Sequence, residues 1–207
     1  MFDLDGTLAD TGRDLADAVN FTRAHFKLTA LADALVLSHV GRGVEHLLRQ
    51  ALPEEDPAHF SEIMSVFLRR YESHLLDATV LYPHAREAVD YFRGKRRAVV
   101  SNKICRLTVE VVRGLGIAGE FDAILGGDSA AQKKPHPALL NHVLEQFDIS
   151  PNRAVMIGDG DIDIEAGKRA GVLTCGVTYG LGDKQALAAA SPDFLVDDLA
   201  SLRDFFC

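Results

Sequence analysis

Apolar residues in the second half of the chain form short runs that alternate with stretches of helical spacing. The runs predict strands at 97–102, 123–125, 154–157, 174–177 and 193–196, and helical patterns fall at 85–93, 107–115, 137–147 and 162–170, with a short helix through 202. Strands that alternate with helices are typical of a parallel sheet with right-handed crossovers. The sequence therefore predicts an α/β fold, a Rossmann-like doubly wound parallel sheet.

Residues 10–80 differ, because their apolar positions recur at helical spacing. Leu15, Ala18, Val19 and Phe26 fit a helix that Asp10 or Thr11 caps, and further helices are expected at 44–52 and 58–76. We expect a Rossmann-like catalytic core of residues 1–9 and 81–207. Residues 10–80 would form an α-helical cap inserted after the first strand, at the carboxyl ends of the strands.

Composition narrows the class of protein further. The 207 residues are 47% hydrophobic and 25% charged, with a net charge of −8, which disfavours nucleic acid as a partner. No apolar run reaches the roughly 20 residues of a membrane helix and no leader precedes the first motif, so we expect a cytoplasmic monomer or homodimer without a membrane partner. Cys105, Cys175 and Cys207 lack metal-ligand spacing and are interpreted as reduced thiols.

The opening segment, residues 1–8, carries two carboxylates close together. If Phe2 to Leu4 is a strand, Asp3 and Asp5 share one pleat face, and Asp5-Gly6 begins the turn that ends it. Two acids at a strand's carboxyl end suit a divalent cation, a nucleophile or an acid/base pair. The alternative is a surface hairpin or helix cap that uses Asp-Gly as a turn.

Three other polar segments are expected at the same edge of the sheet. They are Ser101-Asn102, Lys134-Pro135 and residues 158–163, which read Gly-Asp-Gly-Asp-Ile-Asp. Transfer from a phosphate ester needs a nucleophile, a proton donor for the leaving oxygen, neutralisation of the phosphoryl oxygens and usually Mg²⁺. The acids, the hydroxyl, the amide and the lysine in these segments match those requirements.

These segments together resemble the four motifs of the haloacid dehalogenase superfamily. The motifs are Asp-x-Asp-Gly-Thr, Ser-Asn after a strand, Lys-Lys-Pro-His-Pro, and Gly-Asp-x-x-x-Asp after another strand, and the resemblance covers essentially the whole chain. Residues 126–137, with 171–172 and 176–180, look most like phosphoglycolate phosphatases. The resemblance implies a small phosphorylated metabolite as substrate.

The resemblance also implies a role for each matching residue. Asp3 would be the nucleophile and form an aspartyl-phosphate, and Asp5 would protonate the leaving oxygen and then deprotonate water. Mg²⁺ would be held by Asp3, the Asp5 carbonyl oxygen and Asp159, with Asp163 bound directly or through water. The implied substrate-binding residues are Gly6, Thr7, Arg42, Gly43, Ser101, Asn102 and Lys134. Gly160 stands where relatives often have Ser or Thr.

Several residues near the motifs keep two interpretations. Asp161 fits a solvated loop better than a ligand, and Lys133 fits solvent, although it could exchange roles with Lys134. Arg42, flanked by Gly41 and Gly43, could reach a substrate carboxylate or be a plain loop arginine. The histidines show no paired ligand spacing, so His39, His46 and His84 are read as surface or interface residues.

The function expected is a magnesium-dependent phosphomonoester hydrolase acting on phosphoglycolate or a similar small phosphometabolite. The alternatives are a sugar-phosphate mutase of the same fold and a catalytically silent interaction module. A dehalogenase would not need Asp5 or a metal. A carbon–phosphorus hydrolase would need a cap lysine for a Schiff base, and Lys27, the only lysine expected in the cap, lies in a helix.

Only Met1 and Phe2 precede the nucleophile, where relatives usually have several apolar residues. The first strand is thus expected to be short, and its neighbours to lack backbone partners at the end away from the motifs, at about 1 to 3 kcal/mol per unpaired buried group. We interpret Met1 as a shortened or misassigned start. The motif itself lies at the other end of the strand, so chemistry should not depend on the missing half.

Overall fold

A parallel sheet forms the centre of the protein. The computed structural model describes residues 1–52 and 57–206. Its parallel strands are β3 (Ala98–Val100), β4 (Ala123–Leu125), β5 (Val155–Gly158), β6 (Leu173–Val177) and β7 (Phe194–Val196). β3 pairs with β4, and β6 pairs with both β5 and β7. Phe2 bridges β3 and β5 through Val99 and Ile157, so the chain's first segment lies in the middle of the sheet.

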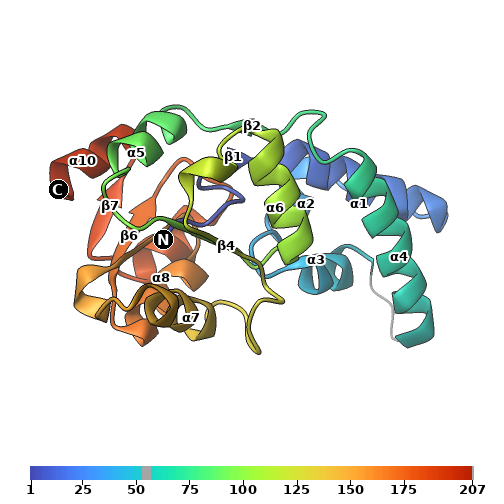
Figure 1. Ribbon diagram of the computed structural model, residues 1–207. Helices are drawn as coiled ribbons and strands as arrows, with labels where there is room; N and C mark the ends of the chain where they lie inside the picture. Colours follow the sequence, from blue (N-terminus) through green and yellow to red (C-terminus); the bar gives the residue numbers. More distant parts are fainter. Residues whose placement is uncertain (53–56, 207) are drawn as a thin grey trace.

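Helices cover both faces of this sheet (Figure 1). They are α5 (Ala85–Tyr91), α6 (Cys105–Gly114), α7 (Ala138–Phe147), α8 (Asp161–Ala170), α9 (Lys184–Ala189) and α10 (Leu202–Phe205), with 3₁₀ turns η1 (Ala118–Glu120), η2 (Pro151–Arg153) and η3 (Leu199–Ser201). In β3, Val99 packs with the cluster that contains α5 and α10, whereas Ala98 and Val100 pack with α7 and α8. Such alternation follows from the two-residue period of a strand. The predicted α/β Rossmann-like architecture is confirmed.

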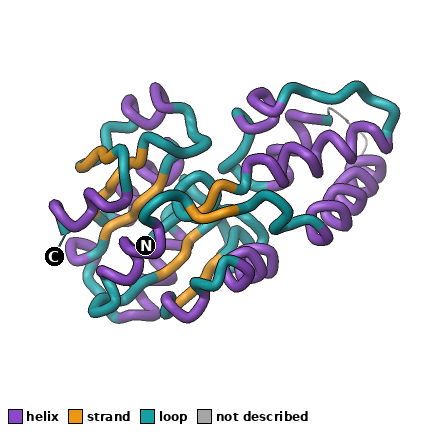
Figure 2. The backbone as a smooth tube through the Cα atoms, turned by 90° about the horizontal axis from the view of Figure 1, so that it is seen from above, coloured by secondary structure: helices purple, strands orange, loops and turns teal. Residues whose placement is uncertain are grey.

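Four helices stand between two short strands that the hydrophobic pattern did not predict. The strands β1 (Ala9–Asp10) and β2 (Val80–Leu81) pair antiparallel, and the helices are α1 (Gly12–His25), α2 (Asp33–Leu37), α3 (Val44–Ala51) and α4 (Pro57–Ser73). Figure 2 shows this helical segment beside the part that holds the sheet. Its buried residues, among them Leu15 and Phe67, belong to the same hydrophobic cluster as Phe2 and Val99. The helical segment is thus packed onto the sheet-bearing part.

The prediction that Phe2 to Leu4 form a strand is wrong for the residues after Phe2. The carbonyl of Leu4 accepts hydrogen bonds from the amides of Thr7, Leu8 and Ala9, so the chain turns at Leu4. Asp3 therefore ends the extended segment and Asp5 lies in the turn, and the two acids do not share one pleat face. The turn thus begins at Leu4, before the Asp5-Gly6 pair that was expected to start it. Leu4 is an apolar residue that is buried within the turn.

Residues 1–3 are hydrogen-bonded to both neighbouring strands. The amide of Phe2 donates to Ala98 O at 2.8 Å and the amide of Asp3 donates to Ile157 O at 2.9 Å, while Met1 donates to Val155 O at 2.9 Å. An apolar cavity of about 340 Å³ lies beside this end of the sheet. Its apolar lining includes Met1, Phe2, Phe92, Phe147, Phe206 and Leu173 of β6, and its charged lining is Lys95, Arg96, Arg97 and Arg153.

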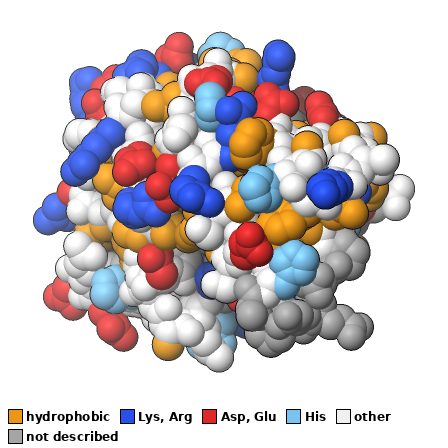
Figure 3. Space-filling model, turned by 90° about the vertical axis from the view of Figure 1, so that its right-hand side faces the viewer, with side chains coloured by type: hydrophobic (Ala, Val, Ile, Leu, Met, Phe, Trp, Pro, Cys, Tyr) orange, Lys and Arg blue, Asp and Glu red, His pale blue; other side chains and the backbone are white. Residues whose placement is uncertain are grey.

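None of the described helices has both the length and the apolar character that crossing a bilayer requires. The face shown in Figure 3 carries acidic, basic and histidine side chains interspersed with hydrophobic ones.

Candidate active site

The predicted motifs meet at the carboxyl ends of the central strands. Asp3 follows the first segment, Ser101 and Asn102 follow β3, and Asp159 follows β5. All four are buried, with no more than 5% of their surface exposed. Parallel strands bring their carboxyl ends to one edge, and loops there position side chains on a rigid base.

Lys134 connects two of the acids. Its ammonium lies 3.0 Å from Asp3 Oδ1 and 2.7 Å from Asp163 Oδ1, and it donates a third hydrogen bond to Val100 O at 2.7 Å. The side chain is fully buried, so the ion pairs are desolvated and need these contacts. Lys134 rather than Lys133 therefore faces the carboxylates.

Asp159 is held by donors from two separate segments. Thr7 Oγ1 donates to Asp159 Oδ1 at 2.9 Å, and the amides of Leu181 and Gly182 donate to Oδ2 at 2.9 and 2.8 Å. The Thr7 hydroxyl thus supports Asp159, a contact that differs from the substrate binding expected of it. Sequence reasoning missed residues 181–182 because backbone amides leave no side-chain signal.

Burial and repulsion between the carboxylates raise the pKa values of Asp159 and Asp3. Burial, together with Asp163, raises the pKa of Asp159 to about 6. Burial raises the pKa of Asp3 to about 8, in spite of the opposing effect of Lys134. Burial lowers the pKa of Lys134, but Asp163 and Asp3 more than offset this and raise it to about 12. The protein's own groups therefore leave Asp3 short of positive charge at neutral pH.

The donor set fits a hard divalent cation. Asp3, Asp159 and Asp163 each offer a carboxylate oxygen, and these oxygens lie within 4.8 Å of one another. Lys134 pairs with two of these three buried carboxylates, Asp3 and Asp163, so a divalent cation would supply the charge that the cluster lacks. Oxygen ligands of this kind suit Mg²⁺.

Asp5 faces a lysine that the motif pattern did not single out. Lys103 Nζ lies 3.1 Å from Asp5 Oδ1, and Thr11 Oγ1 donates to the same oxygen at 2.7 Å. Lys103 also donates to the Tyr71 hydroxyl of α4 at 2.8 Å. A lysine is rarely buried, so sequence alone gave no reason to place it inside; its position directly after Ser101-Asn102 was the only available signal.

Asn102 joins three segments of the site. Its amide nitrogen donates to Gly41 O at 3.0 Å and Lys134 O at 2.8 Å, and its oxygen accepts from the Lys134 amide at 2.8 Å. The Ser101 hydroxyl accepts from the Lys103 amide at 3.2 Å. Asn102 therefore connects the turn between α2 and α3 to the sheet edge and fixes the backbone of Lys134.

Two glycines of the motifs lie where a larger residue would clash. Gly6 has φ of 85°, and a Cβ there would come within 2.1 Å of Asp159 Oδ2. Gly43 has φ of 92°, and its Cβ would meet Asn102 O and Lys133 Nζ at 3.2 Å. Both glycines thus let the backbone approach site residues. Gly160 is the N-cap residue of α8, and its amide donates to Asp163 Oδ2 at 3.1 Å.

Arg42 forms an ion pair with Asp161 across a pocket of about 470 Å³. The guanidinium lies 2.8 Å from Asp161 Oδ2, and the two side chains are 47% and 31% exposed. The pocket lining also includes Asp3, Asp5 and residues from α2 and the 181–184 loop. Asp161, expected as a solvated loop residue, is therefore paired, and Arg42 is engaged by the protein.

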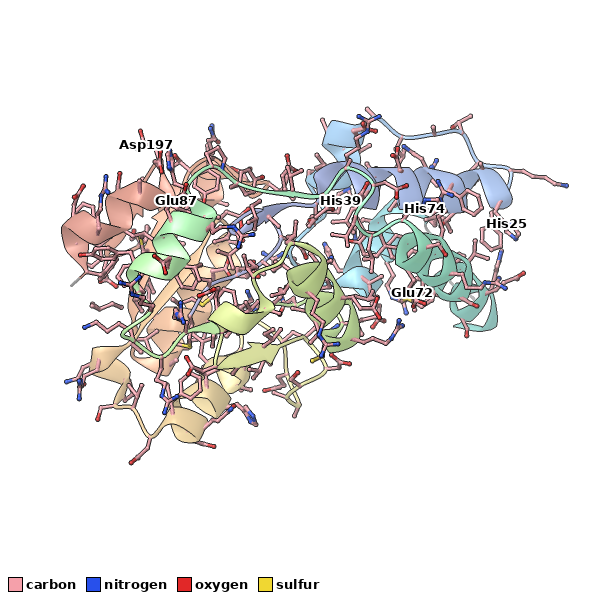
Figure 4. All side chains as sticks on the ribbon, turned by 45° about the horizontal axis from the view of Figure 1, so that its top comes forward. His25, His39, Glu72, His74, Glu87 and Asp197 are labelled. Carbon is pink, nitrogen blue, oxygen red and sulfur yellow. The ribbon has the colours of Figure 1, made fainter. Side chains whose placement is uncertain are left out.

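The histidines and cysteines of the sequence analysis lie outside the acid cluster. His39 packs edge-on against His46, and His84 pairs with Asp198 at 3.6 Å. Figure 4 shows His39 in the helical segment and Glu72 on α4. Glu72 binds Arg106 of α6 and so links this segment to the sheet-bearing part. Cys105 and Cys175 are free thiols, and Cys207 lies outside the described residues.

Comparison with known sequences identifies the family to which this fold and this site belong. The family model of haloacid dehalogenase-like hydrolases matches residues 1–177, and the chain belongs to this family. It is 36% identical over 210 residues to a phosphoglycolate phosphatase of Chromobacterium violaceum, covering 98% of this chain and 93% of that protein. It is 35% identical over 212 residues to a phosphoglycolate phosphatase of Vibrio vulnificus, covering 98% of this chain and 93% of that protein.

A solved structure agrees with these relatives. The crystal structure of a predicted phosphoglycolate phosphatase from Haemophilus somnus superposes with a TM-score of 0.94 at 30% identity, covering 98% of this chain and 95% of that one. The resemblance inferred from the motifs is confirmed, as is the assignment to a hydrolase.

Proposed function

We propose that this protein is a magnesium-dependent phosphomonoester hydrolase that works through an aspartyl-phosphate on Asp3. The observation that carries the proposal is the buried Asp3 carboxylate with Lys134 at 3.0 Å and two further acids beside it. Relatives named phosphoglycolate phosphatase support phosphoglycolate or a similar small ester as the substrate.

Each group in the site has a place in this reaction. One Asp3 oxygen attacks phosphorus and the bond to the ester oxygen breaks, while Asp5 gives its proton to the leaving alcohol. Asp5 then takes a proton from the water that hydrolyses the aspartyl-phosphate. Lys134, the Ser101 hydroxyl and the backbone amide of Asn102 would bind the phosphoryl oxygens, and Lys134 would neutralise part of their charge.

A bound Mg²⁺ would supply positive charge to Asp3 and to the phosphoryl oxygens. Asp3, Asp159 and Asp163 are the side chains that would hold it. The Asp5 carbonyl oxygen remains a predicted ligand. Since burial raises the pKa of Asp3 to about 8, compensation beyond Lys134 is needed for an ionised nucleophile at neutral pH.

Replacement of the nucleophile tests the proposal. Asp3→Asn should reduce phosphate release by about 10⁴-fold or more, because an amide is not a nucleophile and the variant loses a metal ligand. The assay is inorganic phosphate released from phosphoglycolate with Mg²⁺, with circular dichroism to check folding. Asp90→Asn is a matched control, since Asp90 is exposed, pairs with Arg93 and does not line the pockets at the site.

Two results would contradict the proposed mechanism. Covalent radiolabelled phosphate on the Asp3→Asn protein would exclude Asp3 as the nucleophile. A folded wild-type protein that releases no phosphate from any small ester would favour a catalytically silent module.

A further inference from the structure

A buried contact joins the second acid of the site to the helical segment. Lys103 lies between Asp5, at 3.1 Å, and the Tyr71 hydroxyl of α4, at 2.8 Å, and its ammonium is 4.7 Å from the centre of the Tyr71 ring. Lys103 is 8% exposed and Tyr71 is 1% exposed. A cation is thus held where the helical segment meets the active site, and the proposed function does not use it.

The hydrogen bonds at Asp5 leave one of its oxygens available. Lys103 and Thr11 both bind Oδ1. Among the described residues, no side chain or amide binds Oδ2. The Asp5 carboxylate is therefore held through one oxygen, while the other can meet the ester oxygen of a substrate.

A small pocket of about 40 Å³ lies beside these groups. Its polar lining consists of Asp5, Lys103, Tyr71 and the backbone of Gly41 and Gly43, and its apolar lining is Leu15, Val40, Val44, Leu47, Phe67, Ile104 and Leu107. Such a volume holds about three waters. A carboxymethyl group is close to this size, whereas a sugar is far larger. Lys103 supplies the positive charge in the lining of this pocket.

The larger pocket offers a poorer place for an anionic group. It contains Asp3, Asp5, Asp159, Asp161, Asp163 and Asp183 against only Arg42 and Lys184. Arg42 is already compensated by Asp161 at 2.8 Å. An anion attached to the leaving alcohol would be repelled there by six acids against two cations, whereas the lining of the small pocket holds the Lys103 ammonium and the Tyr71 hydroxyl against one carboxylate, that of Asp5.

We propose that Lys103, supported by the Tyr71 hydroxyl, binds the carboxylate of a short leaving group in the small pocket next to Asp5. This inference rests on the proposed function and narrows the substrate to phosphate esters of short hydroxy acids. As Asp3 forms its bond to phosphorus, the ester oxygen keeps the electron pair of the broken bond and takes the proton of Asp5. The product is a hydroxy acid whose carboxylate stays paired with Lys103 until release.

A pair of similar-sized substrates tests the inference. Phosphoglycolate and ethyl phosphate carry similar short groups on the ester oxygen and differ by the carboxylate. Lys103→Met should lower kcat/KM for phosphoglycolate about 10- to 100-fold more than for ethyl phosphate, the range expected for a lost charged hydrogen bond. Lys103→Arg should restore part of the preference, and Tyr71→Phe should weaken it less than Lys103→Met.

Direct binding gives a readout that does not depend on turnover. Glycolate should bind wild-type protein measurably in isothermal titration and lose at least about tenfold in affinity on Lys103→Met. Circular dichroism and melting curves check that each variant folds. If Lys103→Met does not fold, Lys103→Arg and Tyr71→Phe still decide, because both should reduce the preference for the carboxylate ester.

Several outcomes would overturn the inference. An equal loss on both esters would mean that Lys103 acts only by holding Asp5. Loss of the preference in Arg42→Ala, with the preference kept in Lys103→Met, would assign the carboxylate to Arg42. Both results require a wild type that hydrolyses phosphoglycolate. A wild type that hydrolyses other small phosphate esters but not phosphoglycolate would overturn this inference alone, whereas one that releases phosphate from no small ester would overturn the proposed function as well.

Discussion

The surroundings of Asp3 strongly change the pKa of its carboxyl group. It is 4% exposed, lies against Lys134, and also faces three other acids. Burial raises its pKa to about 8, and the same cause raises the pKa of Asp159 to about 6. Each shift favours the neutral acid in the folded protein.

These shifts predict how stability changes with pH. A carboxyl whose pKa is raised on folding stabilises the protein fully below its unfolded value, and that contribution is lost as pH rises through the folded value. Without a divalent cation, the melting temperature should therefore fall between about pH 4 and pH 8 because of Asp3 and Asp159. Thermal melts in chelator across this window measure it, with Asp3→Asn expected to flatten the fall. A melting temperature that rises steadily over the window would contradict it.

Sequence reasoning could predict the site residues whose side chains are suited to catalysis or binding. Asp3, Ser101, Asn102 and Asp159 follow apolar runs, so the topology of a parallel sheet brings them together, whereas Lys134 follows no apolar run and was predicted from the motif resemblance. Lys103 was not predictable, because nothing local distinguishes a buried lysine from a solvated one. The partner of Arg42 was also hidden, since Asp161 is 119 residues away in the chain.

At the scale of elements, the long periodic helices and the apolar parallel strands were predicted, including the three-residue strands β3, β4 and β7, whereas some other short elements were missed. The helices α1, α3, α4 and α7 have apolar faces over two turns or more, so their pattern is distinctive. The pair β1 and β2 has two residues in each strand and α2 has five residues, which is too short for periodicity. Such elements depend on tertiary contacts, such as the pairing of Ala9 with Leu81.

The short first strand leads to a prediction about stability. Residues 1–3 already bond to β3 and β5, but an apolar cavity of about 340 Å³ remains beside Met1. Extending the chain with Lys-Leu-Val-Ile before Phe2 should raise the melting temperature by several degrees, since about 1 kcal/mol shifts the melting temperature of a domain this size by about 2 to 4 °C. Differential scanning calorimetry measures the shift, and a Gly-Ser-Gly-Ser extension is the control.

Turnover should stay unchanged in the extended protein, because Asp3 lies at the opposite end of the segment. A melting temperature no higher than that of the control would mean that the added residues do not enter the cavity or gain nothing there.

At the scale of the whole molecule, the helical segment and the sheet meet at the site through several independent contacts. Asn102 binds Gly41 O, Lys103 binds Tyr71, and Arg42 binds Asp161. Such contacts couple the placement of the helical segment to the sheet edge. Gly41, Lys103 and Tyr71 also line the small space next to Asp5.

The geometry of the acid cluster predicts which cation supports activity. Asp3, Asp159 and Asp163 bring their oxygens within 4.8 Å of one another around a small space. Mg²⁺ accepts six ligands at about 2.1 Å, whereas Ca²⁺ accepts six to eight at about 2.3 to 2.6 Å. Phosphate release should therefore need Mg²⁺, and added Ca²⁺ should inhibit it competitively, because the larger ion would move Asp3 away from in-line attack. Titrating each ion into chelator-treated protein measures this, and full activity in excess chelator would contradict it.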